Sequence, residues 1–463
     1  MGFTSGQSGP IMLGAECRMK DSQQSFAMRL MSADIAASLV PDGAKVAMGL
    51  GVAQPPALLD ALARRAASRK VNGIEVYYLL STAIARETVL RYELRDAIRP
   101  ISLFHSATER ALNDQAAREG GRKVDFLPTA FSQVPRVLTE QVCADTLLTT
   151  VSPMDEHGNV SLGTNTDYAL AVARSAERVI LEVNRNMPRT LGDCLINIAD
   201  VTAVVENDAP LLEVPDAVVR PEDKAIGQII AGLVDDGACL QMGIGAVPQA
   251  VCAALHGHRH LGIHTELMTP GLAALMRAGV VDNSRKNFNP AKAIFTFAMG
   301  DRTLYEFLDG NDALEAHPVD YVNDPSVIAL NDRMVSVNAT LQVDLHGACN
   351  SECVGADQYS ASGGQLDFVR GAYASKRGRS IIACHSTAAK GTVSRIVAHL
   401  DGPVTTPRND THIVVTEHGW ADLKGKTLDE RARALISLAH PDFREALSRR
   451  HCDRTRALER EPD

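Results

Sequence analysis

The first residues that could do chemistry stand at the end of an apolar stretch, in G-I-H-T-E-L-M at residues 262–268. A carboxylate at the carboxyl end of a buried strand lies on the edge where α/β sheets hold their ligands. A glutamate there can act as a nucleophile or as a general base. A lone glutamate at a strand end is also often a solvated or ion-paired surface residue. Glu266 is therefore a candidate catalytic residue that other features of the chain must support.

Two glycine turns, G-L-G at residues 49–51 and G-I-G at residues 243–245, each follow a short apolar stretch. Glycine lets a ligand approach the backbone, and the helix that follows offers free N–H groups to an anion. A dinucleotide fingerprint needs a third glycine, but Gln54 and Pro248 occupy that place. A nicotinamide-dependent dehydrogenase is therefore disfavoured. An anion site and a tight turn without a ligand remain open for both copies.

Two polar loops could complete a site. G-G-Q-L-D-F at residues 363–368 has paired glycines whose amides could meet an oxyanion or a thioester. S-T-A-A-K-G-T-V-S-R at residues 386–395 follows an apolar strand and suits phosphate or carboxylate contacts. Ordinary surface loops and helix caps have the same composition. No G-x-S-x-G elbow occurs, so the sequence does not indicate a serine hydrolase.

Histidines and cysteines do not form a convincing metal motif. A histidine cluster comprises His256, His258, His260 and His264. It follows a predicted helix, at whose C-terminal end the helix dipole favours imidazolium. Cys349 and Cys353 form a C-x3-C pair without a second pair at zinc-like spacing. We therefore expect no metal.

The elements that must position these residues occur twice. Residues 35–51 read IAASLVPDGAKVAMGLG and residues 229–245 read IIAGLVDDGACLQMGIG, at a constant offset of 194 (229 − 35). Each copy predicts a helix, a D-G turn, an apolar strand and a glycine turn. A helix that opens with proline is expected next, over residues 55–67 and 248–255.

A further apolar strand is expected to close each copy, at residues 74–80 and 261–267. Aligning these two strands places Glu266 opposite Tyr77. The first copy therefore manages without a carboxylate, which favours a functional role for Glu266. Additional buried strands are expected at residues 178–184, 380–386 and 412–419.

Alternating helices and strands predict a mostly parallel sheet covered on both faces, and a duplicated unit predicts two of them. We expect two related open α/β domains with the active site in the cleft between them. Residues 1–27 are expected to be a flexible N-terminal extension, residues 28–218 the N-terminal domain, and residues 219–463 the C-terminal domain with the catalytic glutamate. A linker rich in proline and charge, residues 215–225, lies between the domains.

Composition excludes several classes of protein. The chain has 463 residues, too many for one compact core, and 45% of them are hydrophobic, as in a globular protein. A net charge of −9 and 4% aromatic residues argue against a nucleic-acid or anionic-membrane partner. Nine scattered cysteines indicate reduced thiols in a cytoplasmic protein. No apolar run has the length of a membrane span, and the first 25 residues lack the apolar core of a secretion signal.

Several motifs together resemble one family, the acetyl-CoA hydrolase/transferase family of class I CoA-transferases, and most of all its 4-hydroxybutyrate CoA-transferase branch. The resemblance runs from about residue 28 to about residue 447. The motifs that carry it are S-P-M-D-E-H-G (152–158), E-V-N-R-N-M-P-R-T (182–190), M-G-I-G-A-V-P (242–248), G-I-H-T-E-L (262–267), V-N-A-T-L-Q-V-D-L-H-G (337–347), G-G-Q-L-D-F-V-R-G-A (363–372) and V-V-T-E-H-G-W-A-D-L-K-G-K-T (414–427).

The resemblance implies roles for particular residues. By position, Glu266 is the covalent nucleophile. The residues implied to contact CoA are Gly243, Ile244, Gly245, Ala246, Val247, Gly363, Gly364 and Gln365. The nucleotide phosphates need cations, and the candidates are Lys390, Arg395, Lys286 and Lys292. No tightly bound cofactor is implied, because coenzyme A is a co-substrate. Family members are commonly homodimers.

The implied reaction moves CoA from a short-chain acyl-CoA, such as acetyl-CoA or succinyl-CoA, to a small carboxylic acid. 4-Hydroxybutyrate, butyrate and itaconate are candidate acceptors. The chemistry would be ping-pong through a glutamyl-CoA thioester. An acyl-CoA hydrolase that uses the same glutamate has the same motifs and remains an alternative. A non-catalytic acyl-CoA binder is a further alternative, against which the presence of Glu266 speaks.

Overall fold

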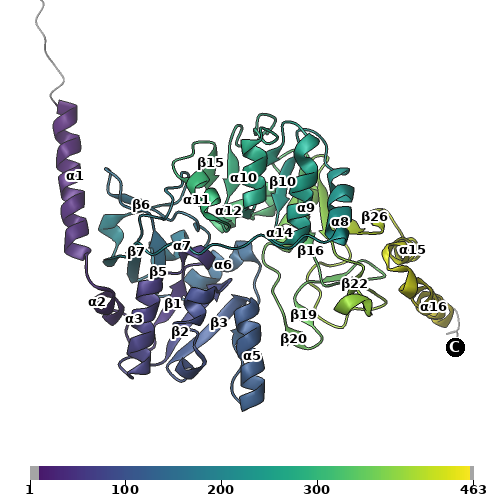
Figure 1. The fold of residues 1–463 in the computed structure, drawn as a ribbon, viewed down its shortest axis with the longest axis horizontal. Helices are drawn as coiled ribbons and strands as arrows, with labels where there is room; N and C mark the ends of the chain where they lie inside the picture. The colour runs from purple at the N-terminus through teal and green to yellow at the C-terminus, as the bar shows by residue number, and fades with distance from the viewer. Residues whose placement is uncertain (1–9, 459–463) are drawn as a thin grey trace, which may run out of the picture.

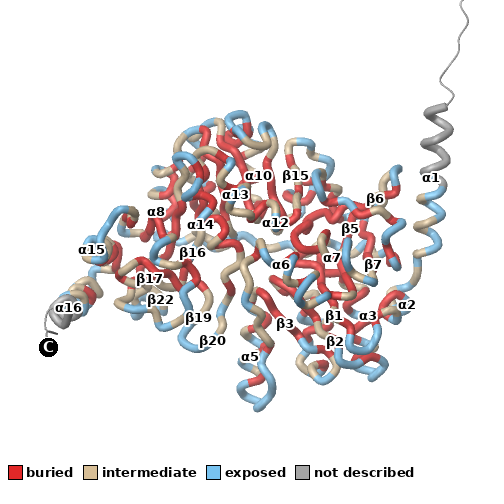
Figure 2. The backbone as a smooth tube through the Cα atoms, turned by 180° about the vertical axis from the view of Figure 1, so that it is seen from behind, coloured by how far each residue is buried: buried red, intermediate tan, exposed pale blue. Residues whose placement is uncertain are grey.

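The computed structural model describes residues 10–458, with side chains from Asp21 to Cys452 and for Met19. Two α/β lobes lie side by side, the N-terminal one in purple and blue and the C-terminal one in teal to yellow (Figure 1). Each lobe has its own buried interior, shown in red in Figure 2. The expected pair of α/β units with mostly parallel sheets is therefore confirmed.

The N-terminal lobe is built on a seven-stranded sheet in the order β4-β3-β2-β1-β5-β7-β9, with every neighbouring pair parallel. Its strands are β1 (Lys45–Met48), β2 (Ile74–Leu79), β3 (Ile98–Phe104), β4 (Asp125–Phe126), β5 (Thr146–Val151), β7 (Arg178–Val183) and β9 (Ala203–Glu206). Its helices are α1 (Pro10–Arg29), α2 (Ala33–Ser38), α3 (Pro56–Ala67), α4 (Ala83–Arg86), α5 (Ala107–Glu119), α6 (Val134–Arg136) and α7 (Ala169–Ser175). A small pair, β6 (Asn159–Ser161) and β8 (Leu195–Asn197), packs beside the sheet.

The C-terminal lobe has a six-stranded sheet in the order β11-β10-β16-β21-β25-β26, in which only the last pair is antiparallel. Its strands are β10 (Cys239–Met242), β11 (Gly262–Ile263), β16 (Met334–Ala339), β21 (Arg379–Ala383), β25 (Ile413–Thr416) and β26 (Gly419–Asp422). Its helices are α8 (Pro221–Ala231), α9 (Ala246–Ala254), α10 (Pro270–Arg277), α11 (Arg302–Leu308), α12 (Val319–Val322), α13 (Pro325–Ile328), α14 (Gln365–Ala374), α15 (Leu428–Leu438) and α16 (Pro441–Leu458).

The second lobe also contains short strands that form small separate sheets. They pair as β12 (Leu267–Met268) with β14 (Phe297–Ala298), β13 (Ala293–Phe295) with β15 (Leu314–Ala316), β17 (Gln342–Asp344) with β18 (Cys349–Asn350) and β24 (Ile396–Val397), β19 (Cys353–Val354) with β20 (Asp357–Gln358), and β22 (Thr387–Ala388) with β23 (Val393–Ser394).

The sequence repeat corresponds to a structural repeat. In the first copy α2, β1, α3 and β2 follow one another, and in the second copy α8, β10, α9 and β11 do the same. In both sheets the first strand of the copy pairs in parallel with the second. The second copy differs in one detail, because α9 begins two residues before Pro248. Proline is tolerated there because the first helical N–H groups have no intrahelical acceptor.

The register of the two copies corrects one alignment made from the sequence. In the first copy Lys45 pairs with Glu75. Cys239, the repeat equivalent of Lys45 (45 + 194), pairs with Gly262 in the second copy. Continuing this register (75 and 262, then 79 and 266) places Glu266 opposite Leu79 rather than Tyr77. The expectation that the first copy lacks the carboxylate still holds, since its equivalent position is leucine.

The strand expected over residues 261–267 is interrupted. β11 ends at Ile263, and the chain resumes as β12, which pairs with β14 instead of the main sheet. The His264 N–H still donates to the Leu240 carbonyl at 3.1 Å, whereas the Thr265 N–H donates to the Ile294 carbonyl at 2.9 Å. Glu266 therefore lies in a break between two strands, where its side chain need not alternate between sheet faces.

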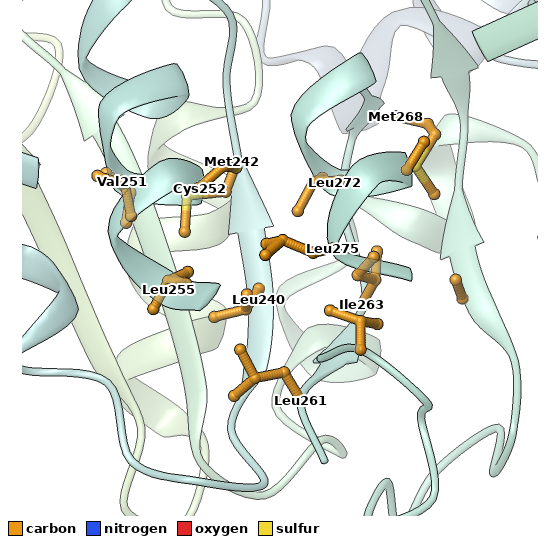
Figure 3. Close-up of a cluster of buried hydrophobic side chains, with 14 of the residues drawn as sticks. Leu240, Met242, Val251, Cys252, Leu255, Leu261, Ile263, Met268, Leu272 and Leu275 are labelled. Carbon is orange, nitrogen blue, oxygen red and sulfur yellow. The ribbon is translucent and has the colours of Figure 1, made fainter. Parts of the chain in front are cut away.

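The core around this break is apolar and closely packed. Figure 3 shows the buried side chains from β10, α9 and α10 in the same cluster as Ile263 and Met268, the two residues that flank the break. The labelled residues are Leu240, Met242, Val251, Cys252, Leu255, Leu261, Ile263, Met268, Leu272 and Leu275. Ile263 and Met268, on the two sides of the break, are both fully buried. Burial of this kind contributes roughly 1.5–3 kcal/mol per large aliphatic side chain, so the backbone on both sides of Glu266 is firmly held.

The N-terminal extension and the segment around the expected domain boundary can be compared with the expectations from the sequence. Residues 10–27 of the expected flexible extension belong to α1, which runs to Arg29 and projects from the body of the N-terminal lobe (Figure 1). Its last residue, Arg29, donates to the Val201 and Ala199 carbonyls at 2.6 and 2.9 Å. Residues 1–9 lie outside the described part of the chain. No helix or strand occurs over residues 207–220, the segment that contains the expected boundary after residue 218.

Among the helices of residues 10–458, none is both long and apolar enough to cross a bilayer.

Candidate active site

A cavity of about 340 Å³ lies between the two lobes and contains Glu266. The N-terminal lobe contributes an apolar wall made of Leu50, Leu79, Leu80, Phe104 and Phe131. The C-terminal lobe contributes polar side chains, among them Gln241, Glu266, Asn338, Thr340, Ser362 and Gln365, together with the turn residues Gly243, Ile244, Gly363 and Gly364. Among the residues that line the cavity, Glu266 is the only carboxylate, and there is no lysine, arginine or histidine.

Two other hollows, of about 430 and 570 Å³, have several charged side chains in their lining. Some of these side chains form ion pairs, as Arg302 does with Glu306 and Arg99 does with Asp125. Neither hollow contains a glycine turn or a carboxylate in an apolar setting. The interlobe cavity is therefore the better candidate for chemistry.

The backbone and side chain of Glu266 are both fixed. The Thr296 and Phe297 N–H groups donate to the Glu266 carbonyl at 3.2 and 3.1 Å. The Asn323 side-chain amide, which is fully buried, donates to Glu266 Oε2 at 2.7 Å. The Gly364 N–H also donates to the carboxylate. One face of the carboxylate is thus occupied by donors, and Glu266 reaches the cavity as a half-buried group.

The surroundings of Glu266 raise its pKa from 4.5 to about 7. Burial in the apolar cavity is the largest cause, because desolvation disfavours the charged form. The nearby Asp367 carboxylate adds to the rise in pKa, while the donors on Asn323 and Gly364 oppose it. A carboxyl group whose pKa lies near 7 can be ionised, as a nucleophile must be, and can also hold a proton. Such a pKa is typical of a catalytic group.

The two glycine turns resolve differently. A side chain at Gly49 would overlap the Ala53 carbonyl, and one at Gly51, where φ is +52°, would meet Met299 Sδ at 3.1 Å. The first turn is therefore filled by the protein itself. At Gly243 and Gly245 no atom lies within 4 Å of a hypothetical Cβ, and Gly245 has φ of +112°.

The second turn opens directly into α9, whose N-cap is Gly245. Gly243 and Ile244 line the cavity, and Ile244 is 52% exposed. Ala246 and Val247 form the first turn of α9, where backbone N–H groups lack intrahelical acceptors. The second glycine turn therefore has both the space and the donors for a ligand. The first glycine turn, at residues 49–51, has no such space and fits a tight turn without a ligand.

The G-G-Q loop packs against Glu266. A Cβ at Gly364 would overlap Glu266 Oε2 and the Asn323 amide nitrogen, so the carboxylate occupies the space that a side chain would need. Gly363 has φ of +51°, and its carbonyl accepts from the Phe131 N–H of the other lobe at 3.0 Å. Gln365 lines the cavity but donates its amide to Thr406 Oγ1 at 3.0 Å. The loop thus joins the two lobes beside the carboxylate.

The cations expected near CoA phosphates lie elsewhere or are occupied. Lys390 is exposed in the β22–β23 loop with φ of +57° and does not line the cavity. Lys286 is buried and donates to the Ile263 and Lys292 carbonyls at 2.9 and 2.7 Å. Arg395 donates to the Leu341 carbonyl at 3.1 Å. Lys286 therefore holds the backbone at the end of β11 and does not line the cavity.

The histidine cluster has separate structural roles. His264 is buried, its Nε2 lies 2.8 Å from the Val322 carbonyl, and burial lowers its pKa to about 3. His260 pairs with Asp282 at 2.8 Å on the surface. Within the described residues, no three histidine, cysteine, aspartate or glutamate side chains converge as metal ligands would.

Asn323 and Asp367 are part of the site but were missed by the sequence analysis. Asn323 lies 57 positions after Glu266 and follows the short helix α12, so no local motif connects them. Asp367 was visible within G-G-Q-L-D-F, where it reads as an ordinary acidic residue in the first turn of α14.

Comparison with known proteins agrees with these features. Models of the acetyl-CoA hydrolase/transferase N-terminal and C-terminal domains match residues 15–215 and 300–451. The chain is 42% identical to 4-hydroxybutyrate coenzyme A transferase of Clostridium kluyveri over 92% of this chain and 97% of that protein. It therefore belongs to the acetyl-CoA hydrolase/transferase family.

Solved structures give the same result. The crystal structure of RipA from Yersinia pestis has a TM-score of 0.91 and 53% identity, over 94% of this chain and 99% of that one. A 4-hydroxybutyrate CoA-transferase from Porphyromonas gingivalis has a TM-score of 0.80 and 37% identity, over 93% of this chain and 99% of that one.

Proposed function

We propose that the enzyme transfers CoA from a short-chain acyl-CoA to a small carboxylic acid, with Glu266 as covalent nucleophile. The observation that carries this proposal is the Glu266 carboxylate, which faces an apolar cavity and is held by two donors beside an open glycine turn. Two of the relatives, at 42% and 37% identity, are CoA transferases by name, which supports the same reaction class. Coenzyme A serves as a co-substrate, without a tightly bound cofactor.

The reaction would proceed in two halves. A Glu266 oxygen attacks the acyl-CoA carbonyl carbon, the C–S bond breaks, and CoA leaves as a thiolate, which leaves a mixed anhydride between the acyl group and Glu266. The thiolate then attacks the glutamyl carbonyl, which releases the free acid and leaves a glutamyl-CoA thioester. The second acid attacks this thioester, and the same steps run in reverse until Glu266 is a free carboxylate again. Each step exchanges one nucleophile for one leaving group, so ping-pong kinetics are expected.

The residues around Glu266 have roles in this scheme. When the glutamyl carbonyl is attacked, its oxygen becomes an oxyanion, and the Gly364 N–H and the Asn323 amide are the donors already placed on that carboxyl group. The apolar wall excludes water that would hydrolyse the anhydride. Leu50, Leu79, Leu80, Phe104 and Phe131 form that wall and would contact the acyl chain.

A steady-state assay tests the proposal. Purified enzyme is given acetyl-CoA or succinyl-CoA with 4-hydroxybutyrate, butyrate, succinate or itaconate, and both the new acyl-CoA and free CoA are measured by liquid chromatography. We expect acceptor-dependent formation of the new acyl-CoA with parallel lines in double-reciprocal plots. Release of free CoA at the same rate without any acceptor would instead assign a hydrolase, and the absence of both products would contradict the proposal.

The pH dependence of activity follows from the raised pKa. Glu266 must be ionised to attack, so kcat/KM should rise with pH and level off above a midpoint at about 7, the pKa of the free enzyme. At pH 6 the rate constant should be about a tenth of its plateau, because one pH unit below the pKa leaves roughly a tenth of the group ionised. The measurement is kcat/KM between pH 5 and 9 at constant ionic strength. A midpoint near 4.5 would contradict the proposed environment of Glu266.

A further inference from the structure

A second buried carboxylate lies next to Glu266 and has no role in the reaction described above. Asp367, in the first turn of α14, is 7% exposed. It acts electrostatically on Glu266, and the Asn323 amide that donates to Glu266 also hydrogen-bonds Asp367. Two carboxyl groups therefore share one amide in a setting of low exposure, where like charges repel strongly.

The amide between them has an unsatisfied atom. Asn323 Oδ1 is buried and has no hydrogen-bond partner among the described residues. A buried acceptor without a donor is costly. Glu266 and Asp367 accept from the nitrogen of this amide, so neither carboxyl group satisfies Oδ1. Because both carboxyl groups share one amide and are shielded from water, their repulsion favours a pair that holds one proton over a pair that carries two negative charges.

Asp367 is also tied to the other lobe. The Ser132 N–H and hydroxyl donate to the two Asp367 carboxylate oxygens at 3.2 and 2.9 Å. Ser132 is next to Phe131, whose N–H donates to the Gly363 carbonyl at 3.0 Å. The Ser362 hydroxyl donates to the Thr129 carbonyl at 3.2 Å. Asp367 therefore accepts bonds from the N-terminal lobe at the place where the two lobes meet beside the cavity.

We propose that Asp367 is a positioning residue that forms a bridged carboxyl pair with Glu266 through Asn323, controls where the proton of that pair resides, and connects it to the N-terminal lobe through Ser132. This inference goes beyond the proposed function and depends on it only for the catalytic meaning of Glu266. The charged group that opposes the pair is Arg370, on the next turn of α14, which is partly engaged by Asp410 at 3.2 Å.

Direct titration of Glu266 tests the pair without any activity measurement. A diazo reagent esterifies protonated carboxyl groups, and the extent of labelling of the Glu266 peptide between pH 5 and 8.5 is read by mass spectrometry in the substrate-free enzyme. Removing the charge with Asp367→Asn should lower the labelling midpoint by about 0.5–1 pH unit, because a neighbouring negative charge favours the protonated form. Glu182→Gln, at a fully buried carboxylate that does not line the cavity, should leave the midpoint unchanged.

Ser132→Ala provides the second variant if Asp367→Asn does not fold. Losing the hydroxyl makes Asp367 easier to protonate, so the Glu266 midpoint should move the same way by a smaller amount. An unchanged or raised midpoint in both variants overturns the bridged pair. The result is separate from that of the proposed function, because labelling reports the pair even if Glu266→Gln keeps its turnover. In the active enzyme, the acid limb of kcat/KM should move with the labelling midpoint.

Discussion

Replacing Glu266 with glutamine should abolish CoA transfer, with kcat/KM falling by roughly 10³-fold or more, as expected when a covalent nucleophile is removed. The amide of glutamine cannot form the anhydride or the glutamyl-CoA thioester. The variant should still bind CoA, because the open turn at Gly243 and Gly245 and the apolar wall are unchanged. The measurement combines the transfer assay with calorimetric titration of CoA.

Glu182→Gln is the matched control. Glu182 is fully buried, and burial raises its pKa to about 7, as for Glu266. Its carboxylate accepts from the Leu58 N–H at 3.0 Å and from Asn207 at 2.7 Å, and it does not line the cavity. We expect activity within a few-fold of wild type. If Glu266→Gln lost no more activity than Glu182→Gln, a covalent role for Glu266 would be ruled out.

The second large effect is expected from a single added methyl group. In Gly364→Ala, the new Cβ would overlap Glu266 Oε2 and the Asn323 amide nitrogen. The backbone angles at Gly364, φ −93° and ψ 12°, are open to alanine, so the effect is steric and not conformational. The carboxylate must move away from both of its donors, and kcat should fall by roughly 10²-fold or more, comparable to the loss of an oxyanion donor.

Gly257→Ala is the control for this substitution. Gly257 is exposed, and nothing lies within 4 Å of its hypothetical Cβ. Its activity and thermal midpoint should match those of wild type. The thermal midpoint of Gly364→Ala should stay close to that of wild type although its kcat falls, because the displaced carboxylate faces a cavity. A Gly364→Ala enzyme with wild-type kcat would show that the carboxylate position seen here is not the reactive one.

Much of the fold could be predicted from the sequence because the duplicated unit repeats a local pattern. The strands, D-G turns and glycine turns of both copies depend on neighbouring residues, and the structure has them at the expected places. The break after Ile263 could not be predicted. It depends on Ile294 and Phe297, which pair with the chain around Glu266 from a distant segment.

Part of the lining of the interlobe cavity could be predicted from residue types alone. A glutamate in an apolar strand and paired glycines in loops identified the part of the chain that lines the cavity. The partners of Glu266 were not predictable, because Asn323 and Ser132 reach the site only through tertiary packing between segments and lobes. The environment of Lys286 could not be predicted for a related reason: it is buried and donates to carbonyl groups, which composition cannot reveal.

The account depends on a covalent bond between Glu266 and CoA, and trapping that bond tests it most directly. Wild-type and Glu266→Gln enzymes are incubated with acetyl-CoA, treated with borohydride, digested and analysed by peptide mass spectrometry. Borohydride reduces a glutamyl thioester to an alcohol, which lowers the mass of the peptide that contains it. We predict this loss at Glu266 in the wild type alone. An unmodified Glu266 in wild-type enzyme that demonstrably binds acetyl-CoA, or a modified residue elsewhere, would contradict the account.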